Sequence, residues 1–332
     1  MARKFTESFD MQSLDQLGTV SDVAIISSSL GGGDFALQLT GFFTKNFATA
    51  EAENYYGFYL QPNAGGWNSA HKQLAWLNGL TILGTLKIND SGKMEAYVGT
   101  GGGETLVGTG TVTWSAGQGK HVQARVLIAN GGGVIQVKAD GVLDIDFSGD
   151  TQPGSETEID GIHMNNTSAV AAMIVNNNSG TKDNGFPGVV RMRGRKPDKD
   201  GFYNEFDREP ASPTTAFDKV DDSGTPDTAD FVSTDVNLEA QSLRFPSHGL
   251  IRADVKAVNY LYYMRKIASG QATHGTRKIA TEANIFDAAP INLSTSFRTE
   301  RFRYTENPHT ALPWVLEDAQ DDRFESIIQS LV

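Results

Sequence analysis

The sequence predicts an all-β protein built around a β-sandwich, and three observations lead to this prediction. Apolar and polar residues alternate at period two through most of the first half, which is the pattern of half-buried strands. Turn-forming residues recur at roughly ten-residue spacing, as in β-sandwiches. The chain also has 35 glycines, which allow the positive φ angles that hairpin tips require.

Strand-like runs follow one another from residue 35 onwards. In "DFALQLTGFF", Phe35, Leu37 and Leu39 fall on one side of an extended chain. The aromatic run "NYYGFYLQP" has the composition that favours strands. The stretch "KINDSGKMEAYV" predicts a hairpin whose turn runs from Asn89 to Gly92.

The clearest alternation lies in "HVQARVLI", residues 121–128. Val122, Ala124, Val126 and Ile128 fall on one face, and His121, Gln123 and Arg125 fall on the other. The next stretch, "VIQVKADGVLDIDF", predicts a hairpin with Asp140 and Gly141 as a two-residue turn.

The chain changes character after this region. Residues 193–230 are rich in Pro, Asp and Gly and are too long for a hairpin loop, and strand-like runs resume afterwards. Near the end, Leu316, Ala319, Arg323 and Ile327 step at helical spacing behind Pro313, which predicts a helix. The predicted parts are a sandwich over 1–190, a connecting segment over 191–235, a second β-rich module over 236–306, and a C-terminal docking segment with the helix over 307–332.

Composition excludes several classes of function. The 332-residue chain has a net charge of −12, so it lacks the basic surface that nucleic-acid binding requires. It has no cysteine, which excludes disulfides and thiolate chemistry. No stretch approaches the roughly 18 apolar residues of a membrane-spanning helix, and the first ten residues do not resemble a secretion signal. We therefore expect no membrane insertion and assembly in a cytoplasm.

The stretch "EIDGIH" raises the question of glycoside chemistry. Retaining glycosidases use two carboxyl groups roughly 5 Å apart. Glu158 and Asp160 fit part of such a pattern, but His163 stands where a second Glu is needed. We expect no catalysis here, and an outer strand of the sandwich with its polar side chains near the rim.

Two further ligand sites are candidates. Asp144, Asp146 and Asp150 could offer oxygen ligands to Ca²⁺, although a solvated strand face explains the same residues. Trp67, in the loop "NAGGWNSAHK", is the candidate for an exposed tryptophan that stacks on a sugar ring, whereas tryptophan in a sandwich is usually part of the core. No other cofactor is expected.

The order of motifs along the chain resembles the concanavalin A/laminin G-like jelly-roll proteins of tailed bacteriophages. The resemblance runs from "FTESFD" through "VTWSAGQGKHVQARVLIANGGGVIQVKADGVLDIDFSGDT" to "YTENPHTALPWVLEDAQDDRFE". The matching positions are Trp114, His121, Gly133, Ile135, Val137, Asp140, Gly141, Gly149, Thr151, Phe186, Gly188, Val190, Pro197, Asp200, Gly201, Asn307, Pro308, Thr310 and Trp314. Asn177 and Asn178 depart from it, because acidic residues often occupy that turn in the family.

The resemblance implies a non-enzymatic structural protein of the virion, placed at the tail, neck or collar and assembled in the bacterial host cytoplasm. Its expected partners are other virion proteins and further copies of itself, as a homo-oligomer for which virion symmetry suggests a trimer. Trp314, Phe324, Ile327 and Ile328 are the expected docking residues. The alternatives are a lectin-like protein that binds host surface glycans, a capsid decoration protein, and a glycoside hydrolase or lyase that uses Glu158.

Overall fold

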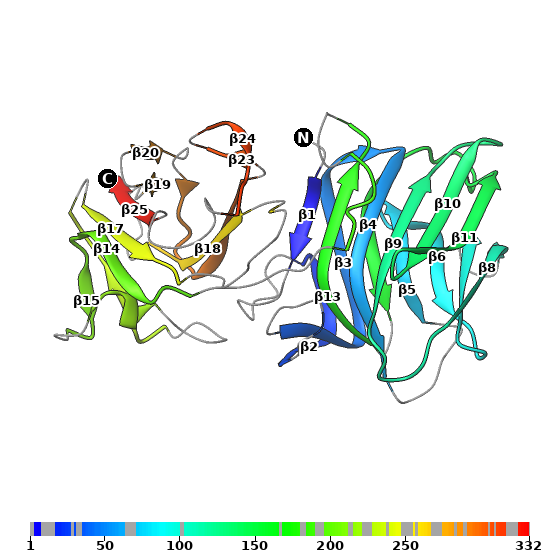
Figure 1. Cartoon of the computed structure of the whole chain (residues 1–332), viewed down its shortest axis with the longest axis horizontal. Helices are drawn as coiled ribbons and strands as arrows, with labels where there is room; N and C mark the ends of the chain where they lie inside the picture. The colour runs from blue at the N-terminus through cyan, green and yellow to red at the C-terminus, as the bar shows by residue number, and fades with distance from the viewer. Residues whose placement is uncertain are drawn as a thin grey trace. The chain divides into compact units, whose positions relative to one another are not determined.

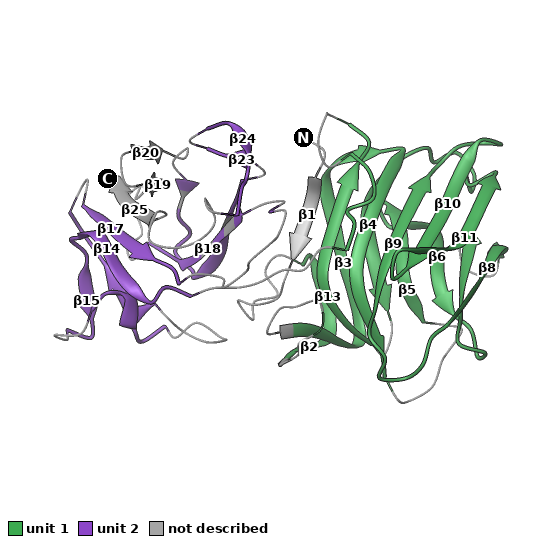
Figure 2. Cartoon of the chain, in the orientation of Figure 1, with its two compact units in different colours: residues 1–194 green, residues 195–332 purple. Residues whose placement is uncertain are grey.

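The chain forms two compact units in a computed structural model, Met1–Gly194 and Arg195–Val332 (Figure 2). The structure describes residues 3–7, 17–27, 30, 35–63, 71–99, 103–165, 168–179, 184–189, 196–211, 215–220, 228–236, 239–246, 255, 258–266, 274–281, 284–287, 291–304, 306–308, 310–316 and 325–331. The boundary between the units lies close to the predicted end of the sandwich at residue 190.

Unit 1 is built from thirteen strands in the described ranges, and these strands form one antiparallel sheet. In chain order they are β1 (Arg3–Glu7), β2 (Thr19–Ser27), β3 (Phe35–Glu51), β4 (Glu53–Pro62), β5 (Lys72–Asn78), β6 (Thr81–Ile88), β7 (Lys93–Val98), β8 (Thr105–Thr113), β9 (Lys120–Leu127), β10 (Gly133–Ala139), β11 (Val142–Gly149), β12 (Ile159–Asn165) and β13 (Ser168–Asn177).

The sheet folds over into a jelly-roll β-sandwich, which confirms the predicted fold (Figure 1). Its strand order is β11-β10-β9-β4-β13-β3-β12-β5-β6-β7-β8, with β1 beside β13 and β2 beside β3. The two end strands, β11 and β8, come together at one side. There the Asp144 carboxylate on β11 accepts hydrogen bonds from the backbone N–H groups of Thr111 and Val112 on β8.

One hydrophobic core lies between the two layers, and it draws alternate residues from every long strand, as period-two patterning requires. Its largest fully buried side chains are Trp76, Trp114, Tyr56, Phe43, Phe58, Leu17, Leu37, Leu39, Leu60, Leu74 and Leu83. The predicted inward face of β9 is confirmed, because Val122, Ala124, Val126 and Ile128 are all buried in this core.

Both predicted hairpins are present. Asp140 and Gly141 join β10 to β11 with φ angles of 50° and 85°, the left-handed values that a two-residue primed turn needs. Asp140 also fixes the turn, because its Oδ1 accepts a 2.8 Å hydrogen bond from the backbone N–H of His121. Asn89 to Gly92 joins β6 to β7, and Gly92 N donates to the Asn89 carbonyl at 2.8 Å.

Unit 2 is a smaller β-rich unit. Its described strands are β14 (Lys199–Asn204), β15 (Asp207–Glu209), β16 (Phe231–Ser233), β17 (Ala240–Arg244), β18 (Val258–Met264), β19 (His274–Thr281), β20 (Asn284–Asp287), β21 (Ile291–Asn292), β22 (Arg298–Tyr304), β23 (Glu306–Asn307), β24 (Leu312–Pro313) and β25 (Glu325–Leu331), with a 3-10 helix η3 (Phe217–Lys219). The main sheet has the order β14-β17-β25-β19-β20, with β21 beside β19, and β15–β16, β18–β22 and β23–β24 form separate pairs.

The predicted C-terminal helix is wrong. Residues 325–331 form β25, which pairs with β17 on one side and β19 on the other. The β-branched Ile327 and Ile328 favour a strand, and two neighbouring strands supply the backbone hydrogen bonds that a helix would have made internally. Across the residues that the structure describes, no helix is long and apolar enough to span a membrane.

Two other expectations from the sequence differ from the structure. The segment predicted to connect the domains, 191–235, contains β14, β15 and β16, and β14 joins the main sheet of unit 2. The "EIDGIH" stretch does not form an outer strand, because β12 pairs with β3 on one side and with β5 on the other.

Candidate functional site

The outer face of β13, β4, β9, β10 and β11 carries the candidate site. Alternate residues of these strands fill the core, so the residues between them point away from it. On β9 the outward residues include Gln123 and Arg125, since Val122, Ala124 and Val126 are in the core. On β4 the core contains Tyr56 and Phe58, which leaves Tyr55 and Gly57 on the outer face.

Five polar residues stand in register across this face, one from each of five adjacent strands. Tyr55 on β4 lies opposite Asn176 on β13 and opposite Arg125 on β9. Arg125 lies opposite Gln136 on β10, and Gln136 lies opposite Asp146 on β11. We call Asn176, Tyr55, Arg125, Gln136 and Asp146 the polar row.

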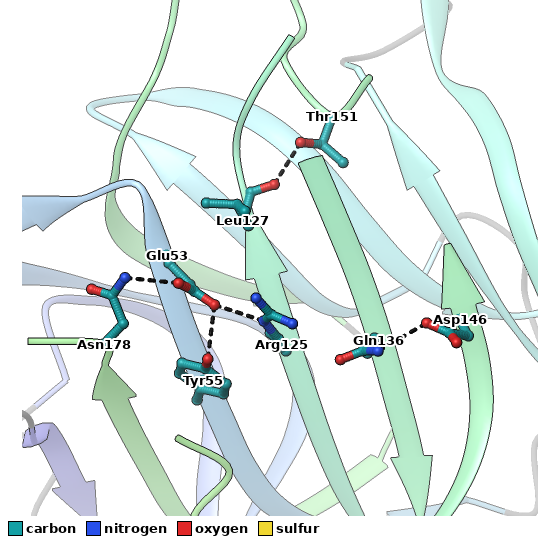
Figure 3. Close-up of polar contacts among 8 residues, drawn as sticks. All are labelled: Glu53, Tyr55, Arg125, Leu127, Gln136, Asp146, Thr151 and Asn178. Atoms are coloured by element: carbon teal, nitrogen blue, oxygen red, sulfur yellow. Dashed lines mark hydrogen bonds and ion pairs between the residues drawn. The ribbon is translucent and has the colours of Figure 1, made fainter. Parts of the chain in front are cut away.

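Glu53, at the start of β4, anchors the row from one side (Figure 3). Its Oε1 accepts hydrogen bonds from the Tyr55 hydroxyl at 2.8 Å and from Arg125 Nε at 2.6 Å. Its Oε2 accepts a third from Asn178 Nδ2 at 2.7 Å. Burial alone would raise the pKa of Glu53, but the bonds from Tyr55 and Arg125 outweigh it and hold that pKa below its ordinary value.

Arg125 keeps donors for a ligand. Its Nε is engaged by Glu53, and its guanidinium carbon lies 5.9 Å from the centre of the Tyr55 ring. The hydrogen bond to Glu53 uses only Nε, and 28% of the side chain is exposed. Farther along the row, Gln136 Nε2 donates to Asp146 Oδ1 at 2.9 Å, which leaves the Gln136 carbonyl and Asp146 Oδ2 as acceptors (Figure 3).

Residues 184–189 cross the same face and are fixed at three points. The Gly185 carbonyl accepts a 3.1 Å hydrogen bond from Asn176 Nδ2, and Gly188 N donates to Gln123 Oε1 at 3.0 Å. Between them Pro187 fills the space beside Gly57, where a Cβ would come within 2.6 Å of the proline ring. The segment therefore holds Phe186 beside the polar row.

Phe186 connects Lys138 to the polar row. Its ring meets the Tyr55 ring edge-on, with the centres 5.5 Å apart. Lys138 Nζ, on β10, lies 4.1 Å from the centre of the Phe186 ring. Arg125, Tyr55, Phe186 and Lys138 thus form one continuous set of contacts, which we call the cation–aromatic cluster.

His121 is buried behind the crossing segment. Its ring lies 4.8 Å from that of Tyr59, and burial lowers its pKa to about 4, although Asp140 opposes this shift. Its side chain therefore stays neutral at neutral pH and serves packing.

A second polar cluster, on β6 and β7, is satisfied within itself. Lys87 forms an ion pair with Glu104, and its Nζ lies 4.6 Å from the centre of the Tyr97 ring. Glu95 accepts hydrogen bonds from Asn89 at 2.7 Å and from Tyr97 at 2.5 Å. Burial and the neighbouring Glu95 raise the pKa of Tyr97 to about 12. These groups bind one another, so they have less capacity for a ligand than the polar row.

The three predicted calcium ligands lie in different surroundings. Asp144 is buried and its Oδ1 binds the β8 backbone, at 2.6 Å from Thr111 N and 2.8 Å from Val112 N. Asp146 belongs to the polar row, and Asp150 Oδ1 accepts from the backbone N–H of Gln152 at 2.9 Å. Within the described ranges no group of three or more His, Asp or Glu residues could hold a metal ion. Calcium binding stays a prediction.

The "EIDGIH" carboxylates are not paired for catalysis. The Asp160 carboxylate accepts bonds from the backbone N–H of Gly79, at 2.9 Å for each oxygen, and so caps the turn between β5 and β6. Glu158 is exposed just before β12. His163 Nδ1 lies 3.1 Å from Thr44 Oγ1, and burial together with the charge of Lys72 lowers its pKa.

The remaining predicted residues divide as follows. Trp67 and Phe324 lie outside the described residues, and Ile327 and Ile328 are in β25. Trp314 is 4% exposed and packs with Tyr260 and Tyr262 inside unit 2, where its Nε1 donates to the Tyr304 carbonyl at 3.0 Å. Trp314 thus belongs to the core of unit 2, and the docking role expected of it stays a prediction.

The sequence identified the outward face of β9 but not the polar row. Alternation in residues 121–128 places Arg125 on the polar side, and that signal was available. The row itself depends on the register between β13, β4, β9, β10 and β11, which are far apart in the sequence. The period of a strand does not reveal its partners.

The chain was compared with known proteins. No protein-family model and no curated protein matches it. Among solved structures it is similar to a carbohydrate-binding module from Bacillus subtilis, at 10% identity and a TM-score of 0.36 over 49% of this chain and 96% of that one. It is also similar to an endo-beta-1,4-glucuronan lyase from Trichoderma reesei, at 12% identity and a TM-score of 0.41 over 52% and 95%. A galectin from Caenorhabditis elegans matches at 12% identity and a TM-score of 0.31 over 47% and 99%.

Proposed function

We propose that the protein binds glycans through the polar row of its jelly-roll unit and does so without cleaving them. The observation that carries this proposal is the row itself: five polar side chains from five strands, Tyr55 among them, aligned on one sheet face beside the ring of Phe186.

The chemistry of the row suits sugar hydroxyls, each of which is both a donor and an acceptor. Arg125 offers terminal N–H donors, while the Gln136 carbonyl and Asp146 Oδ2 offer acceptors. Glu53 fixes Arg125 and Tyr55 before a ligand arrives, so less side-chain entropy is lost on binding. Tyr55 and Phe186 supply apolar contact area beside these polar groups.

The proposed absence of catalysis rests on the carboxylates. Glu53 is held by three hydrogen bonds and its pKa is lowered, which is the reverse of what a general acid needs. Asp160 caps a turn. If polysaccharide cleavage is detected, and Glu158→Gln abolishes it, the lyase or hydrolase alternative replaces this proposal.

A place in a phage particle is a further proposal, and the ordered motif resemblance alone supports it. In that setting several copies of a weak glycan site would gain avidity, because the particle raises their effective concentration. Homo-oligomer formation and contacts with other virion proteins belong to this proposal. Quantifying the chain against the major capsid protein in purified particles by mass spectrometry tests it, and absence from particles would refute it.

A glycan array tests the binding proposal. We expect specific signals for the whole chain and a loss of at least tenfold for Gln136→Ala/Asp146→Ala, which removes exposed or half-buried groups of the row. The matched control is Asp90→Ala/Gln118→Ala, which removes the same two side-chain types from exposed turns. The control should bind like the unmodified chain. Equal signals from both double variants would show that the polar row is not the site.

A further inference from the structure

We propose that the glycan is acidic, and that Lys138 and Arg125 hold the carboxylate of a uronic acid unit against the cation–aromatic cluster. This inference rests on the proposed function and specifies the class of glycan.

Lys138 carries a charge that no described carboxylate compensates. Its Nζ lies 4.1 Å from the Phe186 ring centre on a half-buried side chain. In the part of the chain that the structure describes, no carboxylate forms an ion pair with it. A cation that is partly removed from water without a partner is unfavourable, and a ligand anion would relieve that cost.

Lys138 and Arg125 lie on the same face of two neighbouring strands, β10 and β9. Gln136 lies opposite Arg125, so Lys138, two residues along β10 on the same face, is the diagonal neighbour of Arg125. Side chains at such diagonal positions are roughly 7 Å apart at their bases, within reach of long side chains. Tyr55 contacts Arg125, Phe186 contacts Lys138, and the two rings contact each other, so both cations are positioned by the same aromatic pair.

The guanidinium of Arg125 is held in a geometry that suits a carboxylate. Glu53 engages its Nε and not the two terminal nitrogens, and 28% of the side chain is exposed. Two parallel N–H donors match the two oxygens of a carboxylate, and such charged bonds are about twice as strong as neutral ones. A neutral sugar hydroxyl has a single oxygen and no charge, so it cannot accept from both N–H donors at two oxygens or form an ion pair with Lys138. The chain has a net charge of −12, so its surface as a whole does not attract anions. An anion that binds this chain is therefore held by a local cationic site such as Arg125 and Lys138.

The test compares acidic polysaccharides with their carboxyl-reduced forms. Polygalacturonate, alginate and hyaluronate, each beside its reduced counterpart, are cast into native gels, and the retardation of the whole chain gives the affinity. At least one acidic polymer should bind about tenfold more tightly than its reduced form, the size expected for one charged contact. Lys138→Gln should remove that preference, so that the acidic polymer and its reduced form bind with similar affinity.

Two further variants separate charge from geometry. Arg125→Lys keeps the positive charge but loses the paired donors, so it should also weaken uronate binding by about tenfold. Lys72→Gln makes the same change of charge as Lys138→Gln on β5, in the other layer of the sandwich, and should change nothing. Thermal unfolding of each variant shows that it is folded.

The outcomes are distinct. If a reduced polymer binds as well as its acidic form, the inference about charge fails while the proposed function stands. If no polymer binds in either form, and the array is also blank, both fail. If dextran sulfate binds as tightly as the uronates and Lys72→Gln weakens binding as much as Lys138→Gln, the attraction is non-specific and the inference is overturned.

Discussion

Replacing Asp144 tests how the two end strands of the sheet, β8 and β11, are held together. Strands β8 and β11 are the two ends of the sheet, and the Asp144 carboxylate joins them by accepting from Thr111 N at 2.6 Å and from Val112 N at 2.8 Å. The Thr111 hydroxyl adds a third bond at 3.2 Å. Gly110 leaves room for the carboxylate, because a Cβ there would lie 2.2 Å from Asp144 Oδ2.

The expected magnitude follows from these bonds. A hydrogen bond to a charged group contributes about 1.5–3 kcal/mol, and Asp144→Ala removes two from backbone donors. Water can reach β8 in part, so we expect a loss of about 3 kcal/mol in the free energy of unfolding of unit 1. Asp144→Asn keeps an acceptor at Oδ1 and should cost about 1 kcal/mol. Asp146→Ala, an exposed aspartate two residues along the same strand, is the matched control and should cost less than about 0.5 kcal/mol.

Urea unfolding followed by tryptophan fluorescence measures the effect, because Trp76 and Trp114 are buried in the sandwich. The midpoint should shift with an unchanged slope. Trp314 reports on unit 2, so its transition is separated with a Trp314→Phe background. An Asp144→Ala midpoint equal to that of Asp146→Ala would refute the reasoning. A loss of stability on adding EDTA would instead indicate that Asp144 binds calcium.

Three further predictions concern the same unit. Gly133→Ala should destabilise unit 1 by about 2 kcal/mol, because the added Cβ would lie 1.8 Å from Thr151 Oγ1. The midpoint of urea unfolding measures this loss, and an unchanged midpoint would contradict the packing. His121 has a folded-state pKa of about 4 against 6.5 when unfolded, so stability should fall by up to about 3 kcal/mol as the pH drops from 6.5 to 4. His121→Gln should flatten that part of the pH profile, and an equally steep profile would show that other groups cause it. Arg125→Ala removes an ion-pair partner of the mostly buried Glu53 carboxylate, so it should raise the pKa of Glu53 and shift acid unfolding to higher pH. An unshifted acid transition would contradict the ion pair between Glu53 and Arg125 as an anchor of the row.

The sequence predicted what depends on local pattern. The alternation in residues 121–128 placed Val122, Ala124 and Val126 in the core, and the Asp140–Gly141 turn followed from its chemistry. The strand at 325–331 was predicted as a helix, because apolar residues at helical spacing occur there and the pairing with β17 and β19 is not visible locally.

The polar row lay beyond such reasoning for the same physical cause. Arg125 was placed on a polar face, but its neighbours Tyr55 and Gln136 become neighbours only through strand register. Phe186 reaches the row because Pro187 fits beside a glycine on another strand, which no periodicity encodes. The candidate residues predicted from the sequence were isolated acidic, aromatic or aliphatic side chains, and of these only Asp146 belongs to the row.

Hydroxyl-radical footprinting with the best glycan from the array tests the central claim most directly. Tyr55 and Phe186 are half-buried aromatic side chains at the row, and Phe202 in unit 2, which is 82% exposed, is the internal reference. A bound glycan should lower the oxidation of Tyr55 and Phe186 and leave that of Phe202 unchanged. Unchanged oxidation of Tyr55 and Phe186 at saturating glycan, with protection elsewhere in the chain, would place the binding site away from the polar row.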